Sequence, residues 1–333
     1  MDIRSLGKTG LKVTGLCLGT MTFGNQADKK ASFEILDTAY EAGVNFIDTA
    51  DVYPIGRQSH AVAGTTESII GEWLQGKRDQ VVLATKCFGA MGPGPNEKGL
   101  SRKHIIAAVE DSLRRLKTDY LDLYQAHQFN PDTPMDETLR AFDDLVQQGK
   151  VRYIGISNWR AWHVAKANGI ADRKNYARIV SVQPRYNLLF RMIEDDLVPM
   201  ALDEGIGIIS YNPLAGGMLT GRYGKNARIE EGTRFALGNN AGAFYQERYW
   251  KEATFDAVER YRAWCEEHSL NPVTTAVRWV TQQPGITSAI IGASRPEQLD
   301  ASLQAADMDA LTEQQVAWLD GLWFSLPRRR EFS

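Results

Sequence analysis

The sequence contains little cysteine and no strong excess of either charge, and both features argue against whole classes of protein. Three cysteines, Cys17, Cys87 and Cys265, are scattered over 333 residues, so neither a disulfide framework nor a zinc site is expected. Reduced thiols are typical of a cytoplasmic protein. The formal net charge is −3, and without a polybasic face the chain is expected to bind neither nucleic acid nor an anionic membrane. The basic run Arg328–Arg330 is interpreted as a solvated tail.

Long hydrophobic runs are missing as well. No stretch approaches the roughly 20 apolar residues of a membrane span, and the N-terminal residues do not form a signal peptide. Hydrophobic residues make up 43% and charged residues 24% of the chain, as in a globular protein with a large core. Because the composition does not change along the chain, residues 1–333 are expected to form one domain.

Short aliphatic runs alternate with amphipathic stretches along the whole chain. Runs that are apolar on both faces are typical of parallel strands covered by helices. The eight expected strands are Gly15–Leu18, Asn45–Asp48, Val81–Lys86, Leu121–Ala126, Tyr153–Ser157, Ile179–Gln183, Gly207–Tyr211 and Ser288–Ile291.

Helical periodicity fills most of the gaps between these runs. Ser101 is expected to cap one helix, and two further helices are expected over Trp250–His268 and over Val273–Thr281, which Pro272 opens. The longest stretch without periodicity, Gly221–Tyr249, is expected to be irregular and functional or mobile.

Eight strands that alternate with helices fit either an open doubly wound sheet or a closed barrel. A doubly wound nucleotide-binding sheet should contain G-x-G-x-x-G after its first strand, but residues 20–24 read Thr-Met-Thr-Phe-Gly. We therefore expect an α/β fold of the (β/α)8 TIM barrel type. Two short runs before the barrel, Ile3–Ser5 and Val13–Thr14, predict an N-terminal β-hairpin that could plug the barrel bottom.

Polar residues stand at or just after three successive strand ends. Asp48 ends the second strand, and Tyr53 follows it five residues later; Lys86 ends the third strand, and His127 follows the fourth. Each of the four alone could be a cap, a packing residue or a solvated side chain. Active sites of such barrels lie at the carboxyl ends of the strands, so we expect the four to meet there.

Together these four residues can move a proton to a carbonyl oxygen. A carbonyl group that accepts a hydride develops negative charge on its oxygen and needs a proton there. Tyr53 could give that proton, and Lys86 should lower the pKa of Tyr53 from its usual value of about 10. Asp48 would keep Lys86 charged, and a neutral His127 would orient the substrate oxygen.

The chain resembles the aldo-keto reductases over essentially its whole length. The matching segments are Asn45–Tyr53, Thr85-Lys86, Asp119–His127 and Gly149–Asn158. The resemblance implies a barrel that binds a nicotinamide cofactor without a dinucleotide-binding motif. It also implies that Asp48, Tyr53, Lys86 and His127 are the catalytic residues.

The resemblance further implies a set of cofactor contacts. Arg295 could pair with a 2′-phosphate through a fork of hydrogen bonds, which favours NADP(H) over NAD(H). Where many relatives have Glu-Asn to touch the adenine, this chain has Ala301-Ser302. The expected cofactor-binding residues are Thr20, Met21, Asp48, Ser157, Asn158, Gln183, Tyr211, Asn212, Pro213, Leu214, Gly216, Leu219, Gly221, Gly292, Ser294, Arg295 and Gln298.

The expected function is reduction of an aldehyde or a ketone, possibly a sugar, with Tyr53, His127, Phe129 and Trp159 around the substrate. Two alternatives stay open: a catabolic sugar or polyol dehydrogenase, and a regulatory module like the potassium-channel β subunits. A metal-dependent barrel enzyme would need clustered ligands at the strand ends, and His127 alone does not make a metal site. The resemblance leaves the substrate, the direction of reaction and the oligomeric state open.

Overall fold

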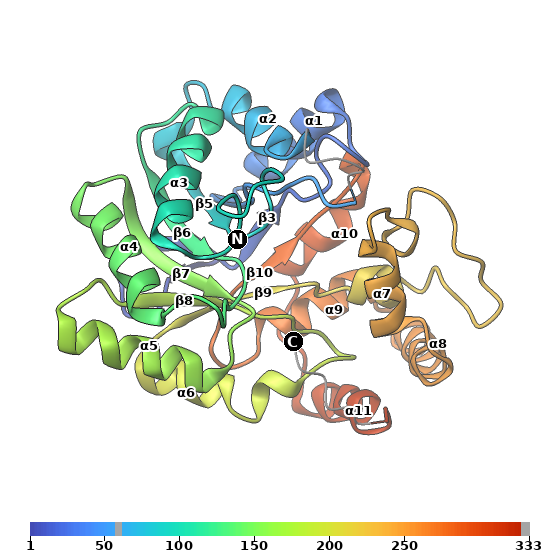
Figure 1. Ribbon diagram of the computed structural model, residues 1–333. Helices are drawn as coiled ribbons and strands as arrows, with labels where there is room; N and C mark the ends of the chain where they lie inside the picture. Colours follow the sequence, from blue (N-terminus) through green and yellow to red (C-terminus); the bar gives the residue numbers. More distant parts are fainter. Residues whose placement is uncertain (57–61, 328–333) are drawn as a thin grey trace.

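A computed structural model describes residues 1–56 and 62–327 (Figure 1); the basic run Arg328–Arg330 lies outside these residues. Eight parallel strands close into a barrel in the order β10-β3-β4-β5-β6-β7-β8-β9, which confirms the predicted (β/α)8 architecture. The strands are β3 (Leu16–Gly19), β4 (Phe46–Asp48), β5 (Val82–Cys87), β6 (Leu121–Ala126), β7 (Val151–Ser157), β8 (Ile179–Gln183), β9 (Gly207–Tyr211) and β10 (Ile286–Ile291).

Observed strand bounds differ from the predicted ones by at most two residues. Strand β7 begins two residues early because Val151 pairs with Leu121, although exposed Arg152 interrupts the apolar run. Strand β10 also begins two residues early, at Ile286, which pairs with Ile208 of β9. The polar residue Thr287 interrupts the apolar run in the sequence, but its side chain is buried in the structure. The polar residues Arg152 and Thr287 therefore concealed two strand starts in the sequence, and pairing with neighbouring strands determines where these strands begin.

Helices form a ring around the barrel (Figure 1). The Ser101 side chain accepts a hydrogen bond from the backbone N–H of His104 at 3.3 Å, which confirms the predicted cap. None of the described helices is long and apolar enough to cross a membrane. The helices are α1 (Lys29–Glu41), α2 (Thr65–Trp73), α3 (Arg102–Leu116), α4 (Met135–Gln147), α5 (Ala161–Lys174), α6 (Leu197–Glu204), α7 (Ala241–Tyr249), α8 (Glu252–Glu267), α9 (Pro272–Thr281), α10 (Asp300–Leu303) and α11 (Glu313–Phe324).

The expected irregular stretch Gly221–Tyr249 was predicted wrongly in part, because its last nine residues form α7. This helix has no apolar stripe for periodicity to detect, since Gly242 and Tyr249 are its buried residues. A β-carbon on Gly242 would lie 2.6 Å from the carbonyl oxygens of Phe235 and Leu237. Close backbone packing, not amphipathic patterning, therefore supports α7.

The predicted N-terminal hairpin consists of β1 (Ile3–Ser5) and β2 (Lys12–Thr14), which pair antiparallel. Its turn covers the amino ends of the strands, because the Lys8 N–H donates to the Gly205 carbonyl at 2.8 Å just before β9. Fully buried Leu6 packs with Phe46 and Leu123 inside the barrel. The hairpin covers the bottom of the barrel and leaves the carboxyl ends of the strands as the end that faces a ligand.

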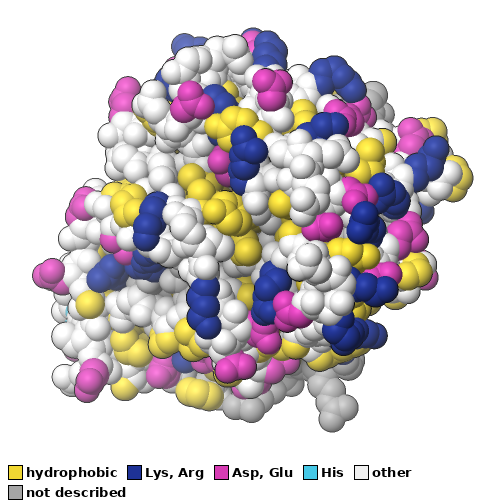
Figure 2. All heavy atoms as spheres, turned by 90° about the vertical axis from the view of Figure 1, so that its left-hand side faces the viewer, with side chains coloured by type: hydrophobic (Ala, Val, Ile, Leu, Met, Phe, Trp, Pro, Cys, Tyr) yellow, Lys and Arg dark blue, Asp and Glu magenta, His cyan; other side chains and the backbone are white. Residues whose placement is uncertain are grey.

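One side of the molecule is shown as spheres in Figure 2, where basic and acidic side chains are interspersed among apolar ones. Neighbouring charges of opposite sign partly cancel in water, so this face offers no extended field of one sign.

Candidate active site

The carboxyl ends of the strands bring the predicted proton-transfer residues together. Asp48 is the last residue of β4, and in the sheet Lys86 on β5 lies directly opposite Gln125 on β6. His127 follows the end of β6, where its N–H donates to the Cys87 carbonyl at 3.0 Å. Closure of the sheet therefore brings side chains that lie up to 79 residues apart in the sequence, from Asp48 to His127, into one cluster.

Lys86 and Asp48 form a buried ion pair. The Lys86 Nζ lies 2.5 Å from Asp48 Oδ2 and donates a second hydrogen bond to the Thr49 carbonyl at 2.8 Å. Both side chains are almost completely removed from solvent. Burial is the largest influence on the pKa of Lys86 and acts to lower it, but Asp48, together with Tyr53 and Cys17, outweighs burial and raises this pKa. The site thus contains a fixed positive charge.

Tyr53 and His127 lie next to this ammonium. The Lys86 Nζ is 5.2 Å from the centre of the Tyr53 ring, and the rings of Tyr53 and His127 meet edge to face with centroids 5.7 Å apart. All four residues predicted to transfer a proton are therefore brought together.

Burial sets the protonation of the two rings. It raises the pKa of Tyr53, whereas Lys86 acts to lower it without overcoming the burial. Lys86 acts in the predicted direction, but the predicted fall in the Tyr53 pKa was wrong as a net shift, because desolvation of the phenolate outweighs the ammonium. Burial and Lys86 together lower the pKa of His127 to about 3. At neutral pH Tyr53 has a proton to give, and His127 is neutral.

Two glutamines complete the surroundings of Asp48. Its Oδ1 accepts hydrogen bonds from Gln183 Nε2 at 2.8 Å and from Gln125 Nε2 at 3.1 Å. Gln183 was a predicted cofactor residue, but Gln125 was missed because it lies within a run expected to be a buried strand. A glutamine inside a strand expected to be buried could have been recognised as a site residue, since a buried amide needs polar partners. The structure shows that Gln125 is fully buried.

The end of β7 presents the predicted carboxamide-binding residues. Ser157 Oγ donates to the Gln183 carbonyl at 2.9 Å, and Asn158 Nδ2 donates to the His127 carbonyl at 3.1 Å. The Tyr211 hydroxyl at the end of β9 donates to Asn158 Oδ1 at 2.9 Å. Asn158 has a left-handed backbone with φ of 59°, a conformation that asparagine tolerates. These hydrogen bonds join the expected cofactor residues to the backbone of His127.

The residues predicted to form a phosphate loop lie in the turn after β9. The Gly216 N–H donates to Asn212 Oδ1 at 2.6 Å, and both residues have positive φ. Asn212 Nδ2 in turn donates to the hydroxyl of buried Tyr249, at the end of α7, at 2.9 Å. Pro213, Leu214 and Gly221 lie in or beside this turn, whereas the Leu219 side chain is part of the core. Leu219 could therefore touch a ligand only through its backbone.

The expected adenosine end lies beyond β10. Gln298 Oε1 accepts hydrogen bonds from the Ser294 N–H at 2.9 Å and the Ser294 hydroxyl at 3.1 Å. Arg295 is exposed and has no ion pair within residues 1–56 and 62–327. A β-carbon on Gly292 would lie 3.1 Å from the Gly19 carbonyl. Gly292 therefore lets this segment approach the end of β3, before Thr20 and Met21.

Arg234 is a second residue that the sequence reasoning missed. Its Nη2 lies 3.9 Å from the place where a β-carbon on Gly292 would be, and its Nη1 contacts the Met21 sulfur. The long segment after β9 thus brings a guanidinium back to the ends of β3 and β10. Only a contact map across the barrel could have revealed it.

The predicted substrate residues Phe129 and Trp159 touch, with ring centroids 5.1 Å apart. Phe129 is also stacked on His163 at 3.7 Å, with the ring planes 14° apart. His163, which the sequence reasoning did not single out, therefore fixes the plane of Phe129. Phe129 follows His127 by two residues and Trp159 follows the end of β7, but contact of either ring with a substrate stays a prediction.

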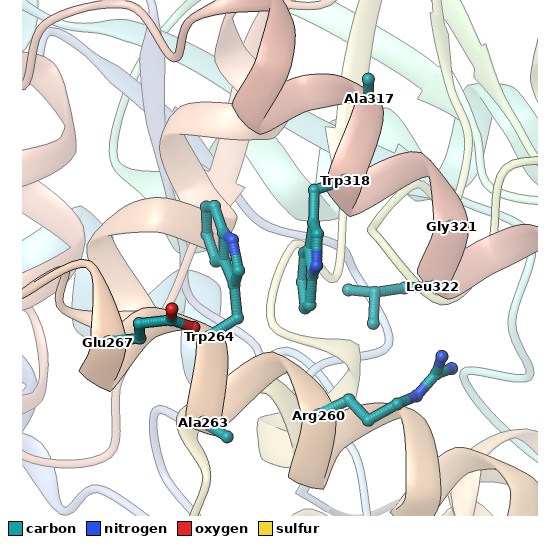
Figure 3. A pocket seen from close by; sticks show the side chains of 8 residues that line it. All are labelled: Arg260, Ala263, Trp264, Glu267, Ala317, Trp318, Gly321 and Leu322. Carbon is teal, nitrogen blue, oxygen red and sulfur yellow. The ribbon is translucent and has the colours of Figure 1, made fainter.

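A hollow of about 570 Å³ lies between α8 and α11, away from these residues (Figure 3). Trp264 and Trp318 stack within it at 4.7 Å, and none of the predicted site residues lines it. In the described part of the chain, no three His, Cys, Asp or Glu side chains are placed to bind one metal ion.

Comparison with known proteins agrees with this geometry. The model of the aldo/keto reductase family matches residues 15–323. The chain belongs to the aldo/keto reductase family. The matched residues contain the whole barrel and its rim, and the chain is an oxidoreductase of this family.

Relatives of this aldo/keto reductase have diverse names. An uncharacterized oxidoreductase, YrpG, of Bacillus subtilis is 40% identical over 322 residues, which cover 92% of each chain. A probable voltage-gated potassium channel subunit beta of Arabidopsis thaliana is 37% identical, again over 92% of each chain. Protein tas of Escherichia coli is 33% identical over 97% of each chain.

Proposed function

We propose that this aldo/keto reductase reduces an aldehyde or a ketone to an alcohol with NADP(H), and that Tyr53 gives the proton. The observation that carries the proposal is the buried Lys86–Asp48 pair beside a protonated Tyr53 and a neutral His127. A carbonyl oxygen needs a proton as it becomes negative, and this group of residues provides one.

The residues of the rim fit a nicotinamide dinucleotide. Ser157, Asn158 and Gln183 offer the donors and acceptors that a carboxamide needs, and Tyr211 offers an aromatic face. The left-handed glycines Gly216 and Gly221 allow a backbone to approach a pyrophosphate closely. Two cations, Arg234 and exposed Arg295, are suited to phosphate groups, Arg295 to a 2′-phosphate.

In the proposed reaction, bound NADPH supplies a hydride to the carbonyl carbon. The Tyr53 hydroxyl gives its proton to the carbonyl oxygen, and Lys86 stabilises the phenolate that is left behind. Asp48 keeps Lys86 charged and in place. Neutral His127 donates a ring N–H to the same oxygen and so orients the substrate. The reverse steps oxidise an alcohol, so a catabolic sugar or polyol dehydrogenase uses the same residues.

The proposed substrate is a small carbonyl compound or a sugar, with Phe129 and Trp159 as the apolar wall beside Tyr53 and His127. A flat aromatic wall suits the apolar face of a sugar or an aldehyde. A cytoplasmic location and the lack of nucleic-acid and membrane partners stay predictions from the sequence.

A second candidate is a regulatory module that binds the cofactor and turns over very slowly. The observation that favours it is the 37% identity with the plant protein named as a probable potassium channel subunit beta. An intact proton-transfer group does not distinguish the two functions, because a module of this kind can retain it.

Fluorescence titration with NADPH and with NADH, followed by a turnover screen over aldehydes, ketoses and aldoses, tests both candidates. NADPH binding with steady turnover supports the reductase. NADPH binding without turnover on any compound favours the regulatory module. Absence of binding to either nucleotide contradicts both.

A further inference from the structure

We propose that Gln125 is a positioning residue that ties Gln183 to the Asp48–Lys86 pair. The proposal rests on the proposed function, in which Gln183 orients the nicotinamide carboxamide and Lys86 supports the proton donor. Gln125 would then link the orientation of the nicotinamide carboxamide to the pKa of the Tyr53 hydroxyl.

Three side chains form a closed triangle of hydrogen bonds. Gln125 Nε2 donates to Asp48 Oδ1 at 3.1 Å, and Gln183 Nε2 donates to the same oxygen at 2.8 Å. Gln183 Nε2 also donates to Gln125 Oε1 at 3.3 Å. The other carboxylate oxygen of Asp48 is taken by Lys86. All these side chains are buried, so water cannot replace a lost partner.

The triangle fixes which way each amide faces. A carboxylate oxygen only accepts, so both glutamines must turn their NH2 groups toward Asp48. Because Gln125 Oε1 takes the second N–H of Gln183, the Gln183 nitrogen has no donor left. Gln183 Oε1 is then the atom available to accept a hydrogen bond from a carboxamide NH2 group. Asp48 and Gln125 thus together hold the NH2 group of Gln183 inward, and Gln125 takes the one N–H that Asp48 leaves free.

The barrel makes room for this side chain at one position. Gln125 lies opposite Lys86 on β5 and Gly155 on β7. A β-carbon on Gly155 would lie 3.1 Å from Gln125 Cγ and 2.4 Å from Ser181 Oγ. Glycine at 155 therefore leaves the space through which Gln125 reaches across the interior.

Gln125 also moderates the charge of Asp48. Asp48 acts to raise the pKa of Tyr53 and Lys86 acts to lower it, with a smaller contribution from Tyr245 on α7. The His127 ring that meets Tyr53 is neutral, and Cys17 lies within reach of the ion pair. Loss of the Gln125 N–H would leave Asp48 less neutralised, so the pKa of Tyr53 should rise.

The test variant is Gln125→Met, which keeps the length of the side chain and removes both hydrogen bonds. Ser181→Ala is the matched control, because its buried hydroxyl lies in the same layer and has no hydrogen-bond partner in the described structure. Alcohol oxidation by the full chain is measured against pH, since this direction needs Tyr53 without its proton. The rate should rise with pH as Tyr53 loses its proton, and this rise is called the limb of the pH profile. Gln125→Met should lower kcat about tenfold or more and shift the limb to a pH that is higher by about half a unit or more.

A purely structural role would lower activity without moving that limb. Ser181→Ala should leave kcat and the limb at their wild-type values. If Gln125→Met has the wild-type limb, or if Ser181→Ala moves it equally, the proposal is overturned.

A second readout needs neither cofactor nor turnover. In cofactor-free protein labelled with ¹⁵N-glutamine, the side-chain NH2 signal of Gln183 is identified by its loss in Gln183→Met. Exchange of these protons with solvent should be at least about tenfold faster in Gln125→Met than in the wild type. Unchanged exchange would overturn the proposal even in an active enzyme. If the wild type instead fails to turn over, faster exchange still supports the link between the glutamines, and the failure belongs to the proposed function.

Discussion

The rings of Tyr53 and His127 meet edge to face, 5.7 Å apart between centroids and 76° between planes. Burial keeps the proton on Tyr53 and lowers the pKa of His127 to about 3. Two uncharged hydrogen-bond donors therefore lie side by side, and the positive charge beside them is that of Lys86, next to the Tyr53 ring. This division of roles leads to separate predictions for each ring.

Tyr53→Phe should keep NADPH binding within about twofold of the wild type while turnover falls by roughly 10² to 10⁴, the usual effect of losing a general acid. The phenyl ring keeps the packing against His127, so the hydroxyl alone is removed. Single-turnover measurements at saturating NADPH provide the test, with circular dichroism as the control for folding. Wild-type turnover in this variant would remove Tyr53 from the role of proton donor.

His127 should make the folded protein sensitive to acid. Its pKa is about 3 in the folded chain against the ordinary histidine value of 6.5, so below pH 6.5 the unfolded state binds a proton that the folded state does not. This contribution to stability is fully present above pH 6.5 and is lost as the pH falls toward 3.

Between pH 7 and pH 5 the loss from His127 alone should reach about 2 kcal/mol. Urea unfolding of wild type and His127→Asn at both pH values measures it. Whatever the variant does to stability at pH 7, its further loss on going to pH 5 should be smaller by about that amount. Equal losses in the two proteins would mean that His127 is not the group responsible.

Arg295→Ala should weaken binding of NADPH about tenfold or more while leaving the affinity for NADH nearly unchanged, because only NADPH has a 2′-phosphate for a charge-assisted contact. The effect should decrease as salt is added, since Arg295 is exposed. Arg173→Ala is a matched control: it removes an exposed arginine in the last turn of α5, at the opposite end of the barrel. Equal losses for the two nucleotides would exclude Arg295 from a 2′-phosphate site.

Gly155→Ala should destabilise the barrel by about 1 to 3 kcal/mol, because the new methyl group meets Ser181 Oγ at 2.4 Å. Ser181→Ala removes that oxygen, so the same change should cost less in a Ser181→Ala background. Chemical unfolding of the two single variants and the double variant gives the coupling between the sites. A cost that is the same in both backgrounds would show that the clash with Ser181 is not the cause.

Much of the fold could be predicted because apolar strands and capped helices leave local signals. Val151 and Ile286 were missed as strand starts because polar neighbours hid them, and pairing with adjacent strands decided them. Helix α7 was missed because its support comes from backbone packing of Gly242 against residues 235 and 237. These differences all arise where backbone pairing or packing, and not a local hydrophobic pattern, supports the element.

The meeting of Asp48, Tyr53, Lys86 and His127 could be predicted because each stands at or just after a strand end, and parallel strands bring such ends to one rim. The sign of the Tyr53 pKa shift could not, because desolvation depends on how completely the folded barrel buries the ring. Gln125 and Arg234 were missed because their contacts at the rim appear only in the folded barrel. In the sequence, Gln125 lies inside a strand and Arg234 lies in a segment without periodicity.

The sequence by itself determined the barrel, the order of its strands and the identity of the residues at their ends, since these follow from hydrophobic patterning and chain direction. Only the tertiary structure decided which atoms share Asp48, how strongly burial opposes Lys86 at Tyr53, and where Arg234 returns to the rim. Hydrogen bonds and desolvation depend on distances of a few ångströms between residues far apart in the chain, and those distances exist only once the barrel has closed.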